Sequence, residues 1–231
     1  MRGFLHQRSL APELLDERAY RDLEELRGNL RDMARYDRCL GVFARATRLV
    51  TAALPPTATG YIGLDVGCGS CDFIAYARQA TPAVRWVGVD VSPDVLRLAR
   101  QMHPEVFAIC AWGMRLPLAD ASVDVVTCIH VLHHLNPPET IALLRELRRV
   151  ARLRVVCLDL SRNVSALVGA WLLTRLTSRN RLTRADGVQS VRRAYTAAEA
   201  ADLARQAGWA HFHTRLHGPF HYSLTLMQSL A

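Results

Sequence analysis

The chain has 231 residues, of which 50% are hydrophobic and 22% charged, a composition typical of a soluble globular protein with one sizeable core. A mean hydropathy of +0.05 excludes a membrane bundle and a disordered chain, and the first residues lack the apolar core of a signal peptide. We expect a cytoplasmic protein, monomeric or homodimeric, with no membrane partner. The net charge of +8 comes from 29 basic residues, all of them scattered arginines, which favours a solvated surface and a GC-rich coding sequence over nucleic-acid binding.

Residues 12–50 carry helical periodicity, because apolar side chains recur at steps of three and four among charged neighbours. The members of this pattern include Leu23, Leu26, Leu30, Met33 and Leu40. A proline-containing run at 54–60 then interrupts the pattern and is typical of a linker. We expect an N-terminal helical cap over residues 1–56 and a second domain over residues 57–231.

From residue 61 onward, short apolar strands alternate with amphipathic helices. The expected strands cover residues 61–66, 84–89, 106–110, 123–129 and 154–158. The expected helices between them cover residues 73–79, 93–102 and 138–150. This alternation predicts an α/β fold, a Rossmann-like parallel sheet with helices on both faces.

The last third of the chain first predicts more helix. A helix over 164–176 lies in an insertion at 161–195, which we expect to form a lid together with the N-terminal helices. Thr196 opens a further helix, with Glu199 as its capping-box partner. Two final strands are expected to pair as an antiparallel hairpin, at residues 210–216 and 220–227. The sheet would then have seven strands.

A glycine loop follows the first expected strand. Gly67 and Gly69 let the backbone turn tightly and approach a ligand closely at the carboxyl end of that strand. Asp72 stands where a dinucleotide-binding loop has its third glycine, and an acid there repels a pyrophosphate. We therefore expect a nucleotide-like ligand without phosphates, positively charged near Asp65 and Asp72. Asp90 ends the second strand, where a carboxylate can accept both hydroxyls of a ribose.

Four segments together resemble the class I S-adenosylmethionine-dependent methyltransferases. They are Asp65-Val66-Gly67-Cys68-Gly69, Val89-Asp90, the run 115–126 and Leu132-His133-His134-Leu135. The resemblance is close over residues 60–160, and the helical cap and the tail at 190–196 look like small bacterial enzymes acting on phenolic, quinone or polyketide-like metabolites. It implies a seven-strand methyltransferase fold, S-adenosylmethionine as cofactor, S-adenosylhomocysteine as product and a small-molecule methyl acceptor.

The resemblance also implies roles for individual residues. Asp65 and the two loop glycines would hold the methionine end of the cofactor, Asp90 its ribose and residues 111–114 its adenine, while His130 would lie near the sulfonium. The full set of expected cofactor-binding residues is Asp65, Gly67, Cys68, Gly69, Asp72, Asp90, Val91, Ala111, Trp112, Gly113 and His130.

Two residues depart from the family's pattern. Cys71 replaces the usual third glycine and places a side chain where the backbone approaches the cofactor. Trp112 stands where the family has an acid that binds the adenine amino group. Since tryptophan can stack on adenine but cannot accept a hydrogen bond from it, we expect the cofactor affinity to be lowered by about ten- to a hundredfold.

Two histidines and an acid are the expected catalytic residues. His133 and His134 follow the fourth strand and Asp159 ends the fifth, so neighbouring strands deliver them to one rim of the sheet. Transfer to a phenol or hydroxyl needs a base with a pKa near neutral, which favours a histidine oriented by Asp159. We prefer His133 as the base. The alternative is that one histidine only caps the helix that begins near Pro137.

The residues expected to contact the methyl acceptor lie outside the sheet and are Tyr36, Trp171, Arg193 and Tyr195. Trp171 suits a hydrophobic acceptor, although helix packing alone also explains it. Arg193 and Tyr195 would line the acceptor pocket or only border a loop before Thr196.

Other readings stay open beside this one. Cys68 and Cys71 have redox-motif spacing, but they lie in the cofactor loop. His211 and His213 share one face of a strand and could bind a metal ion, but we prefer to interpret them as half-exposed strand residues and expect no metal site. The preferred function is methyl transfer to an oxygen, and in second place to a carbon or nitrogen, of an aromatic or polyketide-like molecule. The alternatives are a nucleic-acid methyltransferase, or a protein of this fold that binds the cofactor or another ligand without transfer.

Overall fold

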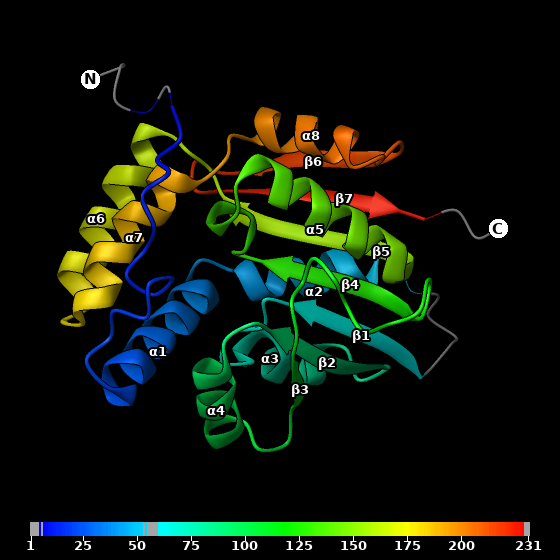
Figure 1. Cartoon of the computed structure of the whole chain (residues 1–231), viewed down its shortest axis with the longest axis horizontal. Helices are drawn as coiled ribbons and strands as arrows, with labels where there is room; N and C mark the ends of the chain where they lie inside the picture. Colours follow the sequence, from blue (N-terminus) through cyan, green and yellow to red (C-terminus); the bar gives the residue numbers. More distant parts are fainter. Residues whose placement is uncertain (1–4, 6, 53, 55–59, 229–231) are drawn as a thin grey trace.

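The computed structural model describes residues 5, 7–52, 54 and 60–228, and it contains a seven-stranded sheet in the order β3-β2-β1-β4-β5-β7-β6 (Figure 1). The strands are β1 (Tyr61–Val66), β2 (Val84–Asp90), β3 (Phe107–Cys110), β4 (Val123–Ile129), β5 (Ala151–Leu160), β6 (Phe212–His217) and β7 (His221–Met227). Strands β1 to β5 are parallel, whereas β7 is antiparallel to both β5 and β6. The predicted Rossmann-like methyltransferase fold with its C-terminal hairpin is confirmed.

The helices cover both faces of this sheet. Their bounds are α1 (Leu23–Cys39), α2 (Val42–Thr51), α3 (Asp72–Ala80), α4 (Pro93–Met102), α5 (Pro137–Val150), α6 (Val164–Thr177), α7 (Arg181–Arg193) and α8 (Ala197–Gln206). Helices α5 and α8 pack on one face, and α2 and α3 pack on the other. Helices α1, α6 and α7 stand at the end toward which the parallel strands point (Figure 1).

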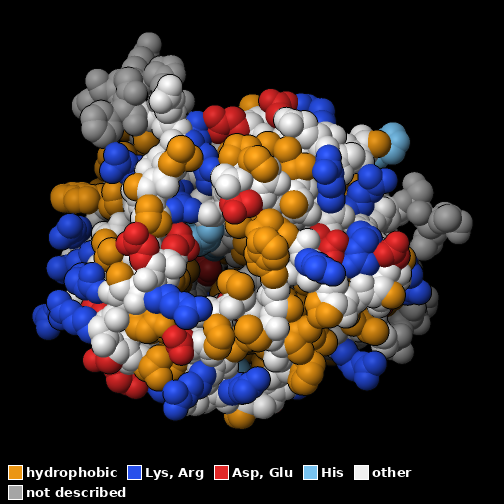
Figure 2. Space-filling model, viewed as in Figure 1, with side chains coloured by type: hydrophobic (Ala, Val, Ile, Leu, Met, Phe, Trp, Pro, Cys, Tyr) orange, Lys and Arg blue, Asp and Glu red, His pale blue; other side chains and the backbone are white. Residues whose placement is uncertain are grey.

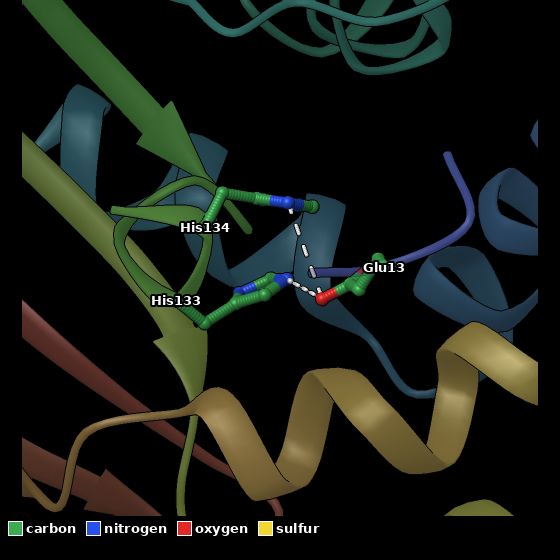
Figure 3. A group of neighbouring side chains, drawn as sticks. All are labelled: Glu13, His133 and His134. Carbon is green, nitrogen blue, oxygen red and sulfur yellow. Dashed lines mark ion pairs between the residues drawn. The ribbon is translucent and has the colours of Figure 1, made fainter. Parts of the chain in front are cut away.

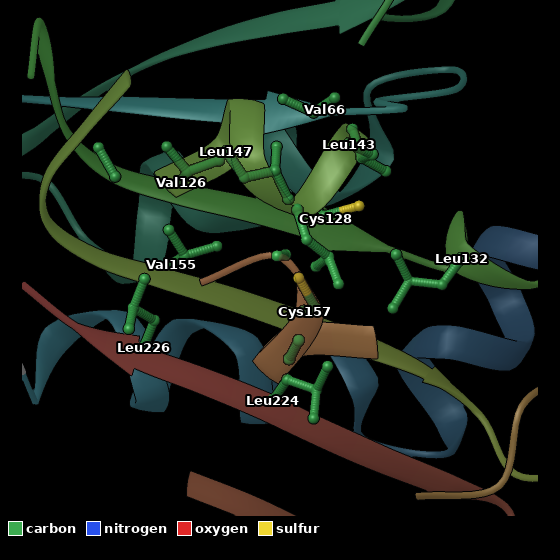
Figure 4. Packing of buried hydrophobic residues seen from close by; sticks show 14 of the residues in the cluster. Val66, Val126, Cys128, Leu132, Leu143, Leu147, Val155, Cys157, Leu224 and Leu226 are labelled. Carbon is green, nitrogen blue, oxygen red and sulfur yellow. The ribbon is translucent and has the colours of Figure 1, made fainter. Parts of the chain in front are cut away.

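The central strand β4 shows why the sheet is buried. Every residue of β4 is buried, because helices cover both of its faces. On one face, Val126 and Cys128 pack with Leu143 and Leu147 of α5, as Figure 4 shows. The largely apolar sequence of β4, interrupted only by Asp124 and Thr127, therefore reflects two covered faces, and the strand lies at the centre of the sheet.

Helix starts follow the capping rules. Thr196 and Glu199 form the predicted capping box of α8. Helix α5 begins with a second capping box, formed by Asn136 and Glu139. Because Asn136 supplies this cap, the alternative in which His133 or its neighbour caps the helix is wrong.

Helix α7 was not predicted as a separate helix. Its half-buried positions carry arginines and a glutamine, and its buried residues include the polar Thr183, Asp186 and Ser190, so its apolar periodicity is weak. Arg193 is the last residue of α7, so the expectation of a loop at this position is wrong. The helix packs against α6 and α1, which form the end wall of the molecule.

The N-terminal segment has two structural environments. Helix α2 packs on the sheet through Val42, Phe43 and Val50, whereas α1 packs against α4 and α7. The predicted linker lies outside the described residues apart from Leu54 and Gly60, and the division into a cap and a domain stays a prediction. Among the described residues, no helix has the length and apolarity needed to cross a membrane.

Candidate active site

The loop after β1 contains three residues with positive φ: Gly67 at 74°, Gly69 at 53° and Cys71 at 65°. A Cβ at Gly67 would lie 2.3 Å from the side chain of Val131, so this position requires glycine. A Cβ at Gly69 would meet nothing within 4 Å. The loop therefore presents bare backbone to an open space beside the sheet.

Cys71 precedes α3 and has the left-handed backbone conformation that favours glycine. Its side chain belongs to the buried core under the sheet, with 1% of its surface exposed, and its Sγ lies 3.6 Å from Sγ of Cys68. The Cys71 side chain was expected where the backbone approaches the cofactor, but its thiol points into the core instead. The same core packing explains how a residue other than glycine is tolerated.

A cavity of about 420 Å³ lies at the carboxyl ends of β1, β2 and β4. Every residue predicted to bind the cofactor lines this cavity, namely Asp65, Gly67, Cys68, Gly69, Asp72, Asp90, Val91, Ala111, Trp112, Gly113 and His130. The hollow in the face shown in Figure 2 has acidic and histidine side chains within it, whereas arginines are spread over the rest of that face.

Two buried carboxylates give the cavity its charge. Asp90 accepts hydrogen bonds from the backbone N–H groups of Gly69 and Ser92, at 2.9 Å each, and burial raises its pKa despite these bonds. Asp65 accepts a hydrogen bond from Thr127 Oγ1 at 2.6 Å, and burial raises the pKa of Asp65 to about 7. A cation near Asp65 would relieve this cost of burial.

Trp112 lies at the mouth of the cavity with 55% of its surface exposed. Its neighbour Gly113 lies against Val66 and Leu143, where a Cβ would come within 2.9 Å of Val66. A flat indole at an open rim can cover a purine by stacking. The position of Trp112 is therefore compatible with the predicted stacking on adenine.

A second cavity of about 320 Å³ adjoins the first. Helices α1, α6 and α7 supply most of its walls. Small residues such as Gly169, Ala170 and Gly187 line it and leave space between these helices. Both cavities are lined by Leu15, Met33, Asp37 and His130. The two cavities are therefore neighbours, and His130 lies on the boundary between them, where its Nε2 is 3.0 Å from Oδ1 of Asp37.

His133 lines the second cavity, and Asp159 fixes its orientation. Its Nδ1 donates a hydrogen bond to Asp159 Oδ1 at 2.6 Å, with both side chains buried. Burial alone would raise the pKa of Asp159, but His133 beside it holds that pKa well below its usual range. This bond fixes the orientation of the imidazole and leaves its Nε2 facing away from Asp159. The predicted pairing of a histidine with Asp159 is present in the structure.

His134 has a different environment from His133. It lines the first cavity, and its Nδ1 donates to Asp16 Oδ1 at 2.8 Å. Burial alone would lower the pKa of His134, but the carboxylates of Glu13 and Asp16 outweigh it and raise that pKa to about 9. A histidine that stays protonated at neutral pH cannot take up a proton, so His134 is the weaker candidate for a base.

Of the residues predicted to contact a methyl acceptor, only Tyr36 lines the second cavity. Trp171 is 51% exposed and lines neither cavity, because α6 turns Gly169, Ala170 and Leu173 toward the second cavity instead. The prediction for Trp171 is therefore corrected: it lies on the outer face of its helix.

Arg193 and Tyr195 also line neither cavity. Arg193 is buried and donates to the carbonyl oxygens of His133 at 3.1 Å and His134 at 2.5 Å. Tyr195 is buried as well and donates from its hydroxyl to the carbonyl oxygen of Leu135 at 2.9 Å. Both residues brace the histidine segment rather than contact a ligand, which corrects their predicted role.

Sequence reasoning missed the acids that reach this site from the N-terminal segment and from α7. Glu13, Asp37 and Asp186 line the second cavity. Asp186 accepts the backbone N–H groups of Leu14 and Leu15 at 2.8 and 3.1 Å, and burial raises the pKa of Asp186 to about 6. No local pattern marks these acids, because their partners are distant in the sequence.

Comparison with known proteins agrees with this architecture. The protein family described as "Methyltransferase domain" matches residues 64–154. The chain is 30% identical over 188 residues to demethylmenaquinone methyltransferase of Roseiflexus sp. strain RS-1, which covers 75% of this chain and 77% of that protein. It is also 30% identical over 131 residues to tRNA (carboxymethyluridine(34)-5-O)-methyltransferase of Saccharomyces cerevisiae, covering 57% of this chain and 43% of that protein.

A solved structure shares the fold at low identity. The plantazolicin methyltransferase BpumL, in complex with SAH, superposes with a TM-score of 0.64 at 14% identity, covering 86% of this chain and 90% of that one. The long match to the Roseiflexus enzyme, together with the family match over β1 to β5, establishes the relationship. The chain belongs to the class I S-adenosylmethionine-dependent methyltransferase family.

Proposed function

We propose that the protein transfers a methyl group from S-adenosylmethionine to an oxygen of an apolar, aromatic or polyketide-like small molecule held in the second cavity. A carbon or nitrogen is the acceptor atom in second place. The observation that carries the proposal is the position of His133, which faces the second cavity with Asp159 bonded behind it. The methyl acceptor and the reactive end of the cofactor would then meet beside His130, where the cavities share a wall.

The residues of the first cavity fit the cofactor. The open space at Gly69 gives the methionine portion direct access to backbone, and the Asp65 carboxylate suits its ammonium group. Asp90, already fixed by two backbone N–H groups, would accept the ribose hydroxyls. When bound, the cofactor supplies an electrophilic methyl group, so the protein has to align the methyl acceptor and remove its proton.

The second cavity supplies alignment and a base. Its walls are mainly apolar side chains such as Leu160, Leu173 and Phe220, which exclude water from an aromatic acceptor. Holding the two reactants in line contributes up to roughly 7–11 kcal/mol to such a reaction. The His133 Nε2 can take the proton of a phenol while Asp159 stabilises the resulting imidazolium. Demethylmenaquinone methyltransferase and the plantazolicin enzyme, both similar to this chain, support a small-molecule acceptor.

Blocking the second cavity tests this assignment. We expect Ala170→Phe to lower acceptor-dependent formation of S-adenosylhomocysteine at least tenfold across a panel of phenols and polyketide-like compounds, because Ala170 lines the cavity. Trp171→Ala is the matched control on the same helix and should leave the rate within about twofold, since Trp171 lines neither cavity. Transfer to an RNA but to none of the small molecules would contradict the proposal.

The raised pKa of Asp65 predicts how cofactor binding depends on pH. Burial keeps the carboxyl protonated below about pH 7, but only the ionised form attracts the ammonium group. We expect the affinity to rise with pH up to about 7, by at most roughly tenfold per pH unit, and then to level off. Calorimetric titrations between about pH 5.5 and 8 check this prediction. Asp65→Asn should bind more weakly at pH 8 and lose most of the slope, whereas an unchanged slope in that variant would assign the proton to another group.

A further inference from the structure

A cluster of two histidines and a glutamate includes the proposed base, His133. Glu13 reaches it from the segment before α1, and His133 and His134 belong to the short 3-10 helix that follows β4. Figure 3 shows the three side chains pointing toward one another. The Glu13 Oε1 lies 3.7 Å from Nε2 of His133 and 4.0 Å from Nδ1 of His134.

The glutamate oxygen at the centre of this cluster has no hydrogen-bond partner among the described residues. The Glu13 side chain is only 3% exposed, so water does not solvate that oxygen freely. A buried carboxylate is normally paired, hydrogen-bonded or bound to a metal ion. Arg193, whose Nε lies 3.9 Å away, approaches Glu13 but donates from that nitrogen to a carbonyl oxygen instead.

Each histidine of the cluster also lies beside a carboxylate, Asp159 at His133 and Asp16 at His134. Asp159 holds Nδ1 of His133 at 2.6 Å, which leaves Nε2 with its lone pair toward Glu13. Asp16 lies 2.8 Å from Nδ1 of His134 and could exchange its hydrogen bond for a contact with a cation. At His133 this is the usual arrangement of a metal ligand, because a carboxylate on the other ring nitrogen fixes the ring and makes the ligand more basic. At His134 the ion would replace the proton that Nδ1 donates to Asp16.

We propose that Glu13 Oε1, His133 Nε2 and His134 Nδ1 bind one divalent transition-metal ion of the Zn²⁺ class. Nitrogen and carboxylate ligands suit such an ion better than Mg²⁺ or Ca²⁺, which prefer oxygen ligands alone. A tetrahedral ion about 2.1 Å from each ligand holds two ligand atoms about 3.4 Å apart. The distances of 3.7 and 4.0 Å would therefore shorten by roughly 0.3 and 0.6 Å. The two histidine nitrogens, which lie within 4.8 Å of each other, would also move together.

The ion would use the lone pair that proton removal by His133 requires. Metal binding and the proposed base role of His133 therefore exclude each other in the same molecule. Addition of one equivalent of Zn²⁺ should slow methyl transfer, and a chelator should restore it. If His133→Asn is slow, so that the base role holds, transfer by the wild type at the full rate with the ion bound would overturn the placement of the ion at His133.

Metal binding is tested directly on the full-length, chelator-treated protein, without cofactor or methyl acceptor, so that the result does not depend on the proposed reaction. Calorimetry with Zn²⁺ and visible absorption with Co²⁺ should both give one ion per chain, with Co²⁺ bands typical of a low-coordinate nitrogen and oxygen site. Glu13→Gln should weaken the affinity at least tenfold. No saturable binding by the wild-type protein would overturn the proposal.

Two further variants make this test specific. His213→Gln changes an exposed histidine on β6, part of the pair for which the sequence offered a metal site, and should leave Zn²⁺ affinity unchanged. His134→Gln removes a second proposed ligand and serves if Glu13→Gln does not fold, as judged by circular dichroism. Equal affinity in the wild type and in a folded ligand variant would contradict the assignment.

Discussion

Replacing His133 by asparagine is expected to lower kcat for methyl transfer by roughly 10²- to 10⁴-fold, the usual contribution of a positioned general base. Asparagine can keep a polar contact with Asp159 but has no group that takes up the proton from the methyl acceptor. Cofactor affinity should stay unchanged, because His133 does not line the first cavity. Initial rates with the best acceptor from the panel, together with calorimetry on S-adenosylhomocysteine, measure both quantities.

His134→Asn is the matched control for this variant. His134 is held by Asp16 and carries a pKa raised to about 9, so it should be protonated already during the reaction. We expect kcat to change by less than about tenfold in this variant, and imidazole in the buffer to restore part of the activity of His133→Asn only. A loss in His134→Asn as large as that in His133→Asn would show that the two histidines are assigned in the wrong order.

The second large effect is expected on cofactor binding. Asp90→Asn should lower the affinity for S-adenosylmethionine and S-adenosylhomocysteine by about a hundredfold. The substitution removes a charged acceptor for two ribose hydroxyls, and these two hydrogen bonds are worth about 3 kcal/mol together. Gly69 and Ser92 donate to different oxygens of Asp90, so the single amide oxygen can keep one of these two bonds, and circular dichroism has to show that the variant is folded. Calorimetric titration of both ligands measures the effect.

Asp202→Asn provides the control for Asp90→Asn. Asp202 is exposed on α8 and pairs with Arg205, far in sequence and structure from the residues that line the first cavity. The affinity of the Asp202→Asn variant for both ligands should match that of the wild type. If Asp90→Asn binds both ligands normally while remaining folded, the cofactor is not held at the end of β2, and the first cavity has to be assigned to another ligand.

The glycine loop and the ribose-binding acid of the cofactor site could be predicted because they lie at the carboxyl ends of neighbouring parallel strands. Gly67 and Gly69 come after β1 and Asp90 ends β2, and parallel strands bring such positions to one edge of the sheet. The periodicity of the sequence predicted the strand ends, whereas the roles of residues 111–114 and His130 were implied only by the family resemblance. His133 and Asp159 were paired by the same reasoning, since β4 and β5 are neighbours.

The methyl-acceptor half could not be predicted in this way. Helix α6 is apolar on nearly every side, so its sequence does not reveal that Ala170 faces inward and Trp171 outward. Arg193 was predicted to line the acceptor pocket because the sequence indicates no partner for it. In the structure its partners are the carbonyl oxygens of His133 and His134, 60 and 59 positions away.

The attachment of the N-terminal segment to α7 also has a consequence for protein synthesis. Leu14 and Leu15 bond to Asp186, 172 and 171 positions later in the chain, and the backbone N–H of Ser9 bonds to the carbonyl oxygen of Arg192. At a ribosomal rate of about 5–20 residues per second, this segment waits roughly 10–30 s for its binding site to emerge. Glu13, which is made early, can therefore reach the histidines only after α7 has folded, and the second cavity is among the last parts of the nascent protein to close.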